Sequence, residues 1–132
     1  MPIVVDASIM ACWHFEDEHN DEADAILNRV EADEAIVPQL WWFEMRNALL
    51  NGERRRRTTA QQTAAFLEFL REVPISVALL PDENAVINLA RRHRLSFYDA
   101  AYLELAKREG YPLATFDHDL IRAAKAERVP LA

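Results

Sequence analysis

Four acidic side chains follow or lie within apolar stretches of the sequence and have no basic residue three or four positions away, although Asp24 and Glu31 also lack such a neighbour. The four side chains are Asp6, Glu44, Asp99 and Asp117. A carboxylate without a partner is costly in an apolar environment, because it loses the stabilisation that water gives its charge. Carboxylates that converge in a fold also repel one another unless a cation neutralises them. Their type and setting therefore indicate a site for a positively charged ligand.

Each acid also has an ordinary structural explanation. Asp6 and Asp117 can cap the helices that follow them, and Asp99 suits the first turn of a helix. Glu44 can face solvent or pair with a distant arginine. Taken singly, the three aspartates are better explained as helix-terminal residues than as catalytic groups. The case for a site therefore depends on their combination.

The available ligand atoms decide which cation is expected. Oxygen ligands without a cluster of cysteine or histidine favour a hard cation, Mg²⁺ or Mn²⁺. The sequence has one cysteine, Cys12, which leaves no intramolecular disulfide and fits a reducing compartment. Zinc is not expected, because the histidines show no ligand spacing. The histidines are His14, His19, His93 and His118.

Short apolar runs alternate with helical segments along the chain. The predicted strands cover residues 3–5, 35–37, 75–79 and 113–115, with a last strand expected from Val129. A first short helix is predicted to begin near Ser8. Further helices are predicted over residues 21–30, 41–51, 58–71, 83–92, 98–109 and 119–126. This alternation is typical of one α/β domain, residues 1–132, with a mainly parallel central sheet flanked by helices. Ligands of such sheets bind at the carboxyl ends of the strands, where Asp6 and Asp117 lie.

The positions of the glycines exclude one kind of ligand site, and the aromatic residues have two possible roles. The only glycines, Gly52 and Gly110, are both expected where a helix ends, which excludes a glycine-rich phosphate-binding loop. Four aromatic side chains invite a role in stacking on bases, but burial in the core or in a dimer interface explains them better. They are Trp13, Trp41, Trp42 and Phe43. Glu104 is expected to form ordinary surface pairs with Lys107 and Arg108.

The formal net charge of −7 argues against broad electrostatic binding of nucleic acid. Two basic runs, residues 54–57 and 91–94, are suited either to phosphate contacts or to solvated helix ends, and the sequence does not choose between them. The N-terminus lacks the features of a signal peptide, and no apolar stretch is long enough to cross a membrane. We therefore expect a soluble, cytoplasmic protein without a membrane partner.

The order of the motifs matches a known family. A Val-Val-Asp-Ala-Ser run ends the first strand, and an apolar helix carries Glu44 and Asn47. A Tyr-Asp-Ala-Ala-Tyr block follows at residues 98–102, and a Thr-Phe-Asp block at residues 115–117. Taken together over nearly the whole chain, the sequence resembles a PIN domain, and specifically the VapC-type toxin of toxin–antitoxin pairs.

The resemblance implies a set of site residues. The family's conserved acids, which bind metal and carry catalysis, fall on Asp6, Glu44, Asp99 and Asp117. Its supporting polar residues fall on Ser8, Asn47 and Thr115, whereas family members differ in whether an acid at the position of Asp119 contributes.

The same resemblance implies an activity and partners. It implies a Mg²⁺- or Mn²⁺-dependent endoribonuclease that hydrolyses structured RNA such as tRNA or rRNA. If a metal-bound hydroxide attacks phosphorus in place of the 2′-hydroxyl, we expect products with a 3′-hydroxyl and a 5′-phosphate. The resemblance further implies a homodimer and a cognate, VapB-like antitoxin whose C-terminal segment blocks the acidic site.

Two rival interpretations remain open. The first is a catalytically silent RNA- or protein-binding module of PIN fold, which metal-dependent turnover would separate from the enzyme. The second is a phosphoryl-accepting receiver domain, which requires an acidic pair after the first strand and a lysine at a late strand end. Here Asp6 is followed by Ala7 and Ser8, and both lysines lie in predicted helices, so the second interpretation is disfavoured.

Overall fold

A computed structural model describes residues 1–132, and its elements follow the predicted order. The strands are β1 (Ile3–Val5), β2 (Ala35–Val37), β3 (Ile75–Val77) and β4 (Leu113–Ala114). The helices are α1 (Ala7–Cys12), α2 (Asp21–Asp33), α3 (Leu40–Arg54), α4 (Ala60–Glu72), α5 (Glu83–His93), α6 (Phe97–Glu109) and α7 (His118–Ala126), with a 3₁₀ turn, η1, at Glu16–Glu18.

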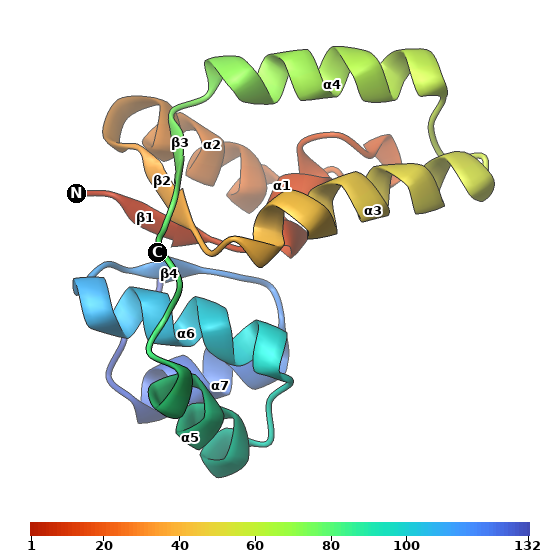
Figure 1. Ribbon diagram of the computed structural model, residues 1–132. Helices are drawn as coiled ribbons and strands as arrows, with labels where there is room; N and C mark the ends of the chain where they lie inside the picture. The colour runs from red at the N-terminus through yellow and green to blue at the C-terminus, as the bar shows by residue number, and fades with distance from the viewer.

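The four strands form one parallel sheet in the order β3-β2-β1-β4. Helices α1 to α4 lie above the strands in Figure 1, and α5 to α7 lie below them. The α/β fold with a parallel sheet between helices is therefore confirmed. The chain proceeds in one direction from β1 to β3 and then crosses to the other side of β1 to form β4, so the strand order reverses between β1 and β4. Such a reversal point is where open α/β sheets bind ligands.

The core is built on β1 and on the helix packed against it. All three residues of β1 are fully buried, as expected for a central parallel strand. Seven consecutive residues of α6, from Ala100 to Ala106, are also buried, because α6 contacts β1, α5 and α7. This tight packing fixes the N-terminal turn of α6, which carries Asp99.

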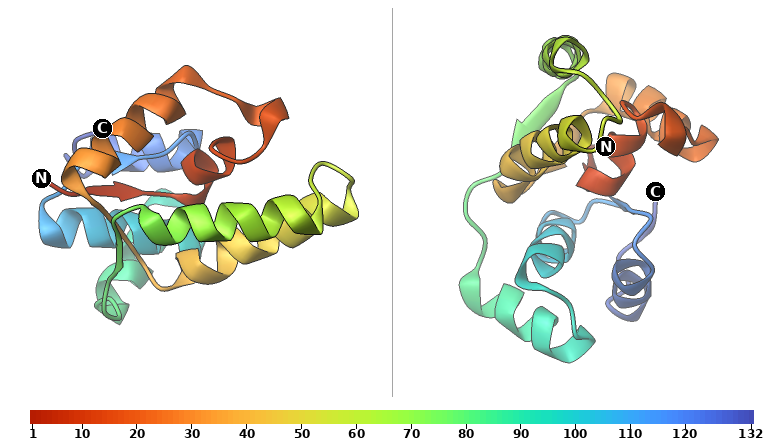
Figure 2. Two further views of the ribbon diagram at one scale, coloured as in Figure 1. Left: turned by 90° about the horizontal axis from the view of Figure 1, so that it is seen from above. Right: turned by 90° about the vertical axis from the view of Figure 1, so that its right-hand side faces the viewer.

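Helices α3 and α4 form an antiparallel pair that extends past the strands, as the left view of Figure 2 shows. Helix α4 begins with a capping box, in which Thr59 accepts from the backbone N–H of Gln62 and the Gln62 side chain accepts from that of Thr59. Phe66 and Leu70 are the buried residues of this helix. No helix of the chain is long and apolar enough to span a bilayer.

Three predictions were wrong. Gly52 lies inside α3 instead of at its end, while Gly110 does end α6 in the left-handed conformation. The last strand does not form, and Leu131 makes only an isolated parallel bridge to Leu113. Glu104 forms the predicted ion pair with Arg108, but it is buried instead of exposed, and Lys107 pairs with Glu127 instead.

Candidate active site

Asp6 and Thr115 lie side by side because of the register between the two strands that precede them. Val5 of β1 pairs with Ala114 of β4, so the next residue of each chain segment emerges at the same edge of the sheet. The backbone N–H of Asp6 continues the ladder by donating to the carbonyl of Ala114 at 3.1 Å. The sheet itself thus places Asp6 and Thr115 in contact.

The Asp6 carboxylate is buried and held by three donors. Its Oδ1 accepts from Ser8 Oγ at 2.6 Å and from the backbone N–H of Ile9 at 3.2 Å, and its Oδ2 accepts from the hydroxyl of Thr115. The contact with Ile9 makes Asp6 the N-cap of α1, as the structural explanation predicted. Burial nevertheless raises the pKa of Asp6, and the charge of Asp99 adds to the effect.

Asp117 is joined to Asp6 through Thr115. The Thr115 hydroxyl, while donating to Asp6, accepts from the backbone N–H of Asp117 at 3.0 Å. The Oδ1 atom of Asp117 caps α7 by accepting from the backbone N–H of Leu120 at 3.0 Å. Its Oδ2 atom accepts no hydrogen bond from the protein, so one oxygen of this carboxylate stays available.

Glu44 approaches the same place from α3. Its Oε1 atom accepts a hydrogen bond of 2.6 Å from the hydroxyl of Tyr102, which is buried in α6. Partial burial raises the pKa of Glu44, and the charges of Asp6 and Asp99 raise it further, while the Tyr102 bond opposes them. Tyr102 belongs to the motif at residues 98–102, but its partner was not predicted. A buried tyrosine hydroxyl needs a hydrogen-bond partner, which was the available signal.

Asp99 completes the group from the first turn of α6, where Ser96 caps the helix by accepting from the backbone N–H of Asp99 at 3.0 Å. Asp99 thus lies in the first turn of the helix, as the structural explanation predicted, whereas the cap itself is Ser96. Partial burial raises the pKa of the Asp99 carboxyl, and the charges of Asp117 and Asp119 add to this. The structure thus brings together Asp6, Glu44, Asp99 and Asp117, which we call the acid site.

The acid site has a strong excess of negative charge. No lysine, arginine or histidine side chain forms a hydrogen bond or ion pair with any of its four carboxylates. Asp99 feels the charge of Asp119, but Asp119 itself is exposed and pairs with Arg122 at 2.8 Å. Ser8 contacts Asp6 directly, whereas Asn47 is exposed and makes no hydrogen bond.

The donor atoms fit a hard divalent cation. They are carboxylate oxygens, supported by the hydroxyls of Ser8 and Thr115, with no sulfur or imidazole among them. No three of the acids bring ligand atoms within 4.8 Å of one another. Mg²⁺ uses one or two protein carboxylates and keeps several waters, so this wider spacing suits it.

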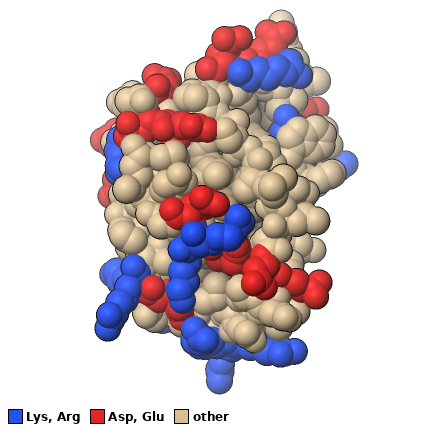
Figure 3. Space-filling model, turned by 60° about the vertical axis from the view of Figure 1, so that its left-hand side comes forward, with Lys and Arg blue, Asp and Glu red and all other residues tan.

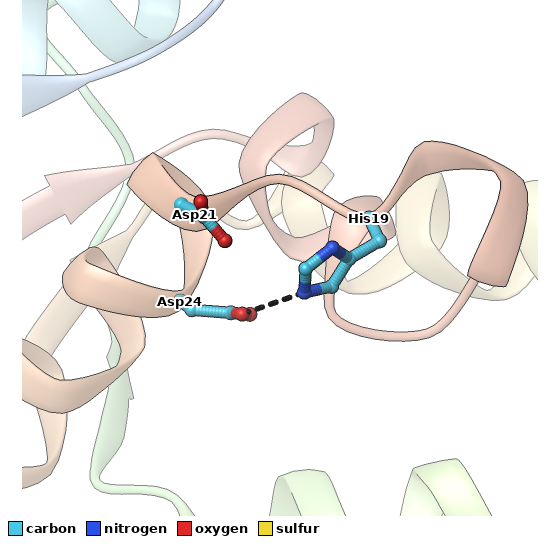
Figure 4. A group of neighbouring side chains, drawn as sticks. All are labelled: His19, Asp21 and Asp24. Atoms are coloured by element: carbon cyan, nitrogen blue, oxygen red, sulfur yellow. Dashed lines mark hydrogen bonds and ion pairs between the residues drawn. The ribbon is translucent and has the colours of Figure 1, made fainter.

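A tighter group of potential ligands lies elsewhere, at His19, Asp21 and Asp24 (Figure 4). The ring of His19 forms a hydrogen bond of 2.9 Å with the carboxylate of Asp24. Asp24 therefore has a partner in the fold, although no basic residue lies three or four positions from it in the sequence. Asp21 and Asp24 lie in the first turn of α2, where the helix dipole favours acids. The group is largely exposed and its residues are explained without a ligand.

The two basic runs lie at the C-terminal ends of α3 and α5, and part of each run pairs with acidic neighbours. Arg57 bonds Asp17 and Glu18, and Arg92 bonds Glu127. Figure 3 shows acidic and basic side chains intermixed on one face of the molecule, without a continuous basic surface there. These contacts favour the helix-end interpretation of both runs.

Of the four aromatic residues considered for base stacking, only some are buried. Trp41 is in the core, and Trp13 donates to the backbone carbonyl of Ala23. Trp42 and Phe43 are exposed, with Arg46 4.1 Å from the centre of the Trp42 ring.

Comparison with known proteins agrees with this architecture. The model of the PIN-domain family matches residues 3–126. Ribonuclease VapC3 of Pyrobaculum aerophilum is 32% identical over 136 residues, covering 98% of this chain and 96% of that protein. Among solved structures, PAE2754 of Pyrobaculum aerophilum has a TM-score of 0.70 at 26% identity, over 93% of this chain and 86% of the other. FitAcB of Neisseria gonorrhoeae shares the fold, with a TM-score of 0.69 at 15% identity over 98% and 95% of the two chains. The match over almost the full length shows that this chain belongs to the PIN-domain family and is of the VapC type.

Proposed function

We propose that this protein is a Mg²⁺- or Mn²⁺-dependent endoribonuclease and the toxin of a toxin–antitoxin pair. The observation that carries the proposal is the acid site, where burial and, to a smaller extent, mutual repulsion raise the pKa values of Asp6, Glu44 and Asp99 with no basic side chain to balance them. The similarity to ribonuclease VapC3 supports RNA as the substrate.

In the proposed reaction the ion would lie among Asp6, Glu44, Asp99 and Asp117 and be bound directly by one or two of these carboxylates. A divalent ion at this place would activate water for hydrolysis and stabilise charge on the phosphate. The protein's own contribution is positioning: Ser8, Ile9 and Thr115 fix the orientation of Asp6, and Tyr102 fixes that of Glu44. Water, and not a side chain or the ribose 2′-hydroxyl, would be the nucleophile: its oxygen bonds to phosphorus while the bond from phosphorus to O3′ breaks, which leaves a 3′-hydroxyl and a 5′-phosphate.

The test is cleavage of purified tRNA and rRNA by protein freed of any antitoxin, with Mg²⁺ or Mn²⁺ and with EDTA. We expect discrete cuts that EDTA abolishes and that Asp99→Asn reduces at least about 100-fold, a loss of about 2.7 kcal/mol in barrier lowering. The matched control is Asp33→Asn on the surface of α2, which should cut normally. A product ending in a 2′,3′-cyclic phosphate, or full activity of Asp99→Asn, would refute the proposed mechanism. Metal binding without cleavage of any RNA would favour the silent binding module.

The proposal includes two protein partners. One is a cognate antitoxin of the VapB type, which would inhibit cleavage when added to the purified chain. The other is a second copy of this chain, since Val77, Leu79 and Leu80 expose apolar surface at and after the edge strand β3. Sedimentation equilibrium should give a dimer mass, and Leu79→Glu with Leu80→Glu should give a monomer. We also propose that the protein acts in the cytoplasm and that its substrates are structured RNAs such as tRNA or rRNA.

A further inference from the structure

A small cavity lies beside the acid site. It has a volume of about 290 Å³, and three of its lining residues also hold the acid site together. Ile9 and Thr115 both donate hydrogen bonds to Asp6, and the backbone N–H of Phe116 donates to Ser8 Oγ at 3.3 Å. The cavity therefore shares part of its wall with the acid site, although none of the four acids lines it.

The opposite wall is one face of α2. Glu22, Ile26 and Arg29 line the cavity at intervals of four and three residues, which places them on the same side of a helix. Ile26 is buried and forms the apolar floor, while Glu22 and Arg29 are exposed at the rim. Neither the Glu22 carboxylate nor the Arg29 guanidinium forms a hydrogen bond or ion pair within the protein, in contrast to Arg57 and Arg92.

We infer that this cavity is a base-recognition pocket, which takes one nucleobase adjacent to the scissile phosphate of the RNA. The inference rests on the proposed ribonuclease function and deepens it. A volume at the lower limit for ligand pockets suits a single planar group better than a helix or an RNA strand. The aromatic ring of Phe116 in its lining can stack on a base of any type.

The two rim residues supply the polar part of recognition. The Watson–Crick edge of every nucleobase carries N–H donors together with oxygen or nitrogen acceptors. A carboxylate can only accept and a guanidinium can only donate, so Glu22 and Arg29 together can read both kinds of group. Removing either one would leave binding by stacking and shape, with weaker discrimination between bases.

The test is sequencing of the cleavage products of an RNA library randomised around the cut. We expect wild-type protein to prefer one base at a position next to the cut. Glu22→Gln and Arg29→Gln should each reduce that preference about tenfold, which is the scale of one lost base contact. Two matched controls should keep the preference: Glu31→Gln, on the far side of α2, and Arg71→Gln, on α4. Unchanged preference in both pocket variants, with cleavage intact, would overturn the inference and leave the nuclease function standing.

A binding measurement separates the pocket from the nuclease activity. Fluorescein-labelled single-stranded RNAs are titrated against Asp99→Asn protein, with and without Arg29→Gln, and the anisotropy is recorded. We expect the second substitution to weaken binding of the RNA sequence that Asp99→Asn protein binds most tightly about tenfold. If wild-type protein cuts no RNA, the proposed function fails and this comparison alone decides the pocket, with equal affinities overturning it. Weaker inhibition by the antitoxin, with RNA preference unchanged, would also overturn it and assign the cavity to a peptide side chain.

Discussion

Thr115 donates its hydroxyl hydrogen bond to the buried carboxylate of Asp6, although 109 residues separate them in the chain. The same hydroxyl accepts from the backbone N–H of Asp117, so one side chain orients two acids of the site. The bond exists because Val5 and Ala114 are in register, which brings the ends of β1 and β4 together.

Thr115→Val should therefore damage both stability and activity. The valine keeps the shape of the threonine but leaves a buried carboxylate oxygen without its donor, which costs about 1.5–3 kcal/mol of the free energy of unfolding. Urea unfolding measures the first effect and RNA cleavage the second. Thr63→Val is the matched control, because its hydroxyl donates to Glu53 away from the site, so it should lose stability alone. Full activity in Thr115→Val would show that this bond does not position Asp6.

Tyr102→Phe tests the second positioning contact. Phenylalanine preserves the buried ring and removes only the bond to Glu44, so the pKa of Glu44, already raised by burial, should rise further. We expect a loss of about 0.5–1.5 kcal/mol in unfolding free energy and a higher concentration of Mg²⁺ needed for half-maximal cleavage. Tyr111→Phe should change neither quantity, since the Tyr111 hydroxyl makes no hydrogen bond. An unchanged Mg²⁺ requirement in Tyr102→Phe would argue against a role of Glu44 in metal binding.

Removing one charge from the acid site should stabilise the metal-free protein. The pKa of Asp99 is raised in the fold by burial and by Asp117, so its charged form is disfavoured there relative to the unfolded chain. Stability of the EDTA-treated protein should then increase as the pH falls from neutrality through this raised pKa. At pH 7, Asp99→Asn should gain about 1 kcal/mol and show a flatter pH dependence.

The same pair of proteins reports on the ion. Added Mg²⁺ should raise the melting temperature of the wild type, because a ligand of the folded state stabilises it by mass action, and should have a much smaller effect on Asp99→Asn. Differential scanning fluorimetry with and without Mg²⁺ measures both. Equal shifts in the two proteins would place the ion elsewhere, and the exposed group at His19, Asp21 and Asp24 is then the site to mutate.

The sequence predicted which acids converge better than how they are held. Asp6 and Asp117 end strands, and in a parallel sheet the ends of neighbouring strands meet at one edge, so their convergence follows from local patterns alone. That β4 lies next to β1 instead of at the far edge is a property of the crossover, which local patterns do not encode. The contact between Glu44 and Tyr102 likewise depends on how α3 and α6 approach each other across 58 residues.

Neighbouring aromatic residues show the same limit. Trp41 is buried and donates to the sulfur of Met10, whereas Trp42, the next residue, is half exposed. Successive side chains on a helix point about 100° apart, so an unbroken apolar run does not reveal which of its members faces the core. The helix α3 was predicted correctly in type, but its buried side was set by the elements packed on it.

Gly52 shows a packing constraint that the sequence concealed. It lies inside α3, where a Cβ atom would meet two carbons of the Phe15 ring at 2.5 and 2.7 Å. Gly52→Ala should therefore lose about 1–3 kcal/mol from overpacking, although alanine is normally the better helix former. Adding Phe15→Leu should recover part of the loss in a double-mutant cycle. A Gly52→Ala protein more stable than the wild type would show that Phe15 moves aside freely.

Glu127, which follows α7, contacts side chains of α5 and α6, and we expect these contacts to weaken in acid. Its carboxylate accepts from Lys107 at 2.6 Å, from His93 at 2.6 Å and from Arg92 at 2.9 Å, and these contacts lower the pKa of Glu127 to about 2. A lowered pKa in the folded state means that the charged form contributes stability above the ordinary pKa near 4.3, and that this contribution is lost as the pH falls from there to about 2.

Glu127→Gln should accordingly be less stable than the wild type by about 1.5–3 kcal/mol at pH 7, the range for hydrogen bonds to charged groups. The difference should shrink below about pH 4.3, because the unfolded wild type then takes up a proton that the folded protein does not, and it should be nearly gone near pH 2. Urea unfolding of both proteins at pH 7, 4 and 2.5 measures the trend, with the exposed Glu31→Gln as the control. A difference that stays constant across this range would mean that the glutamine disturbs packing instead of removing a charge.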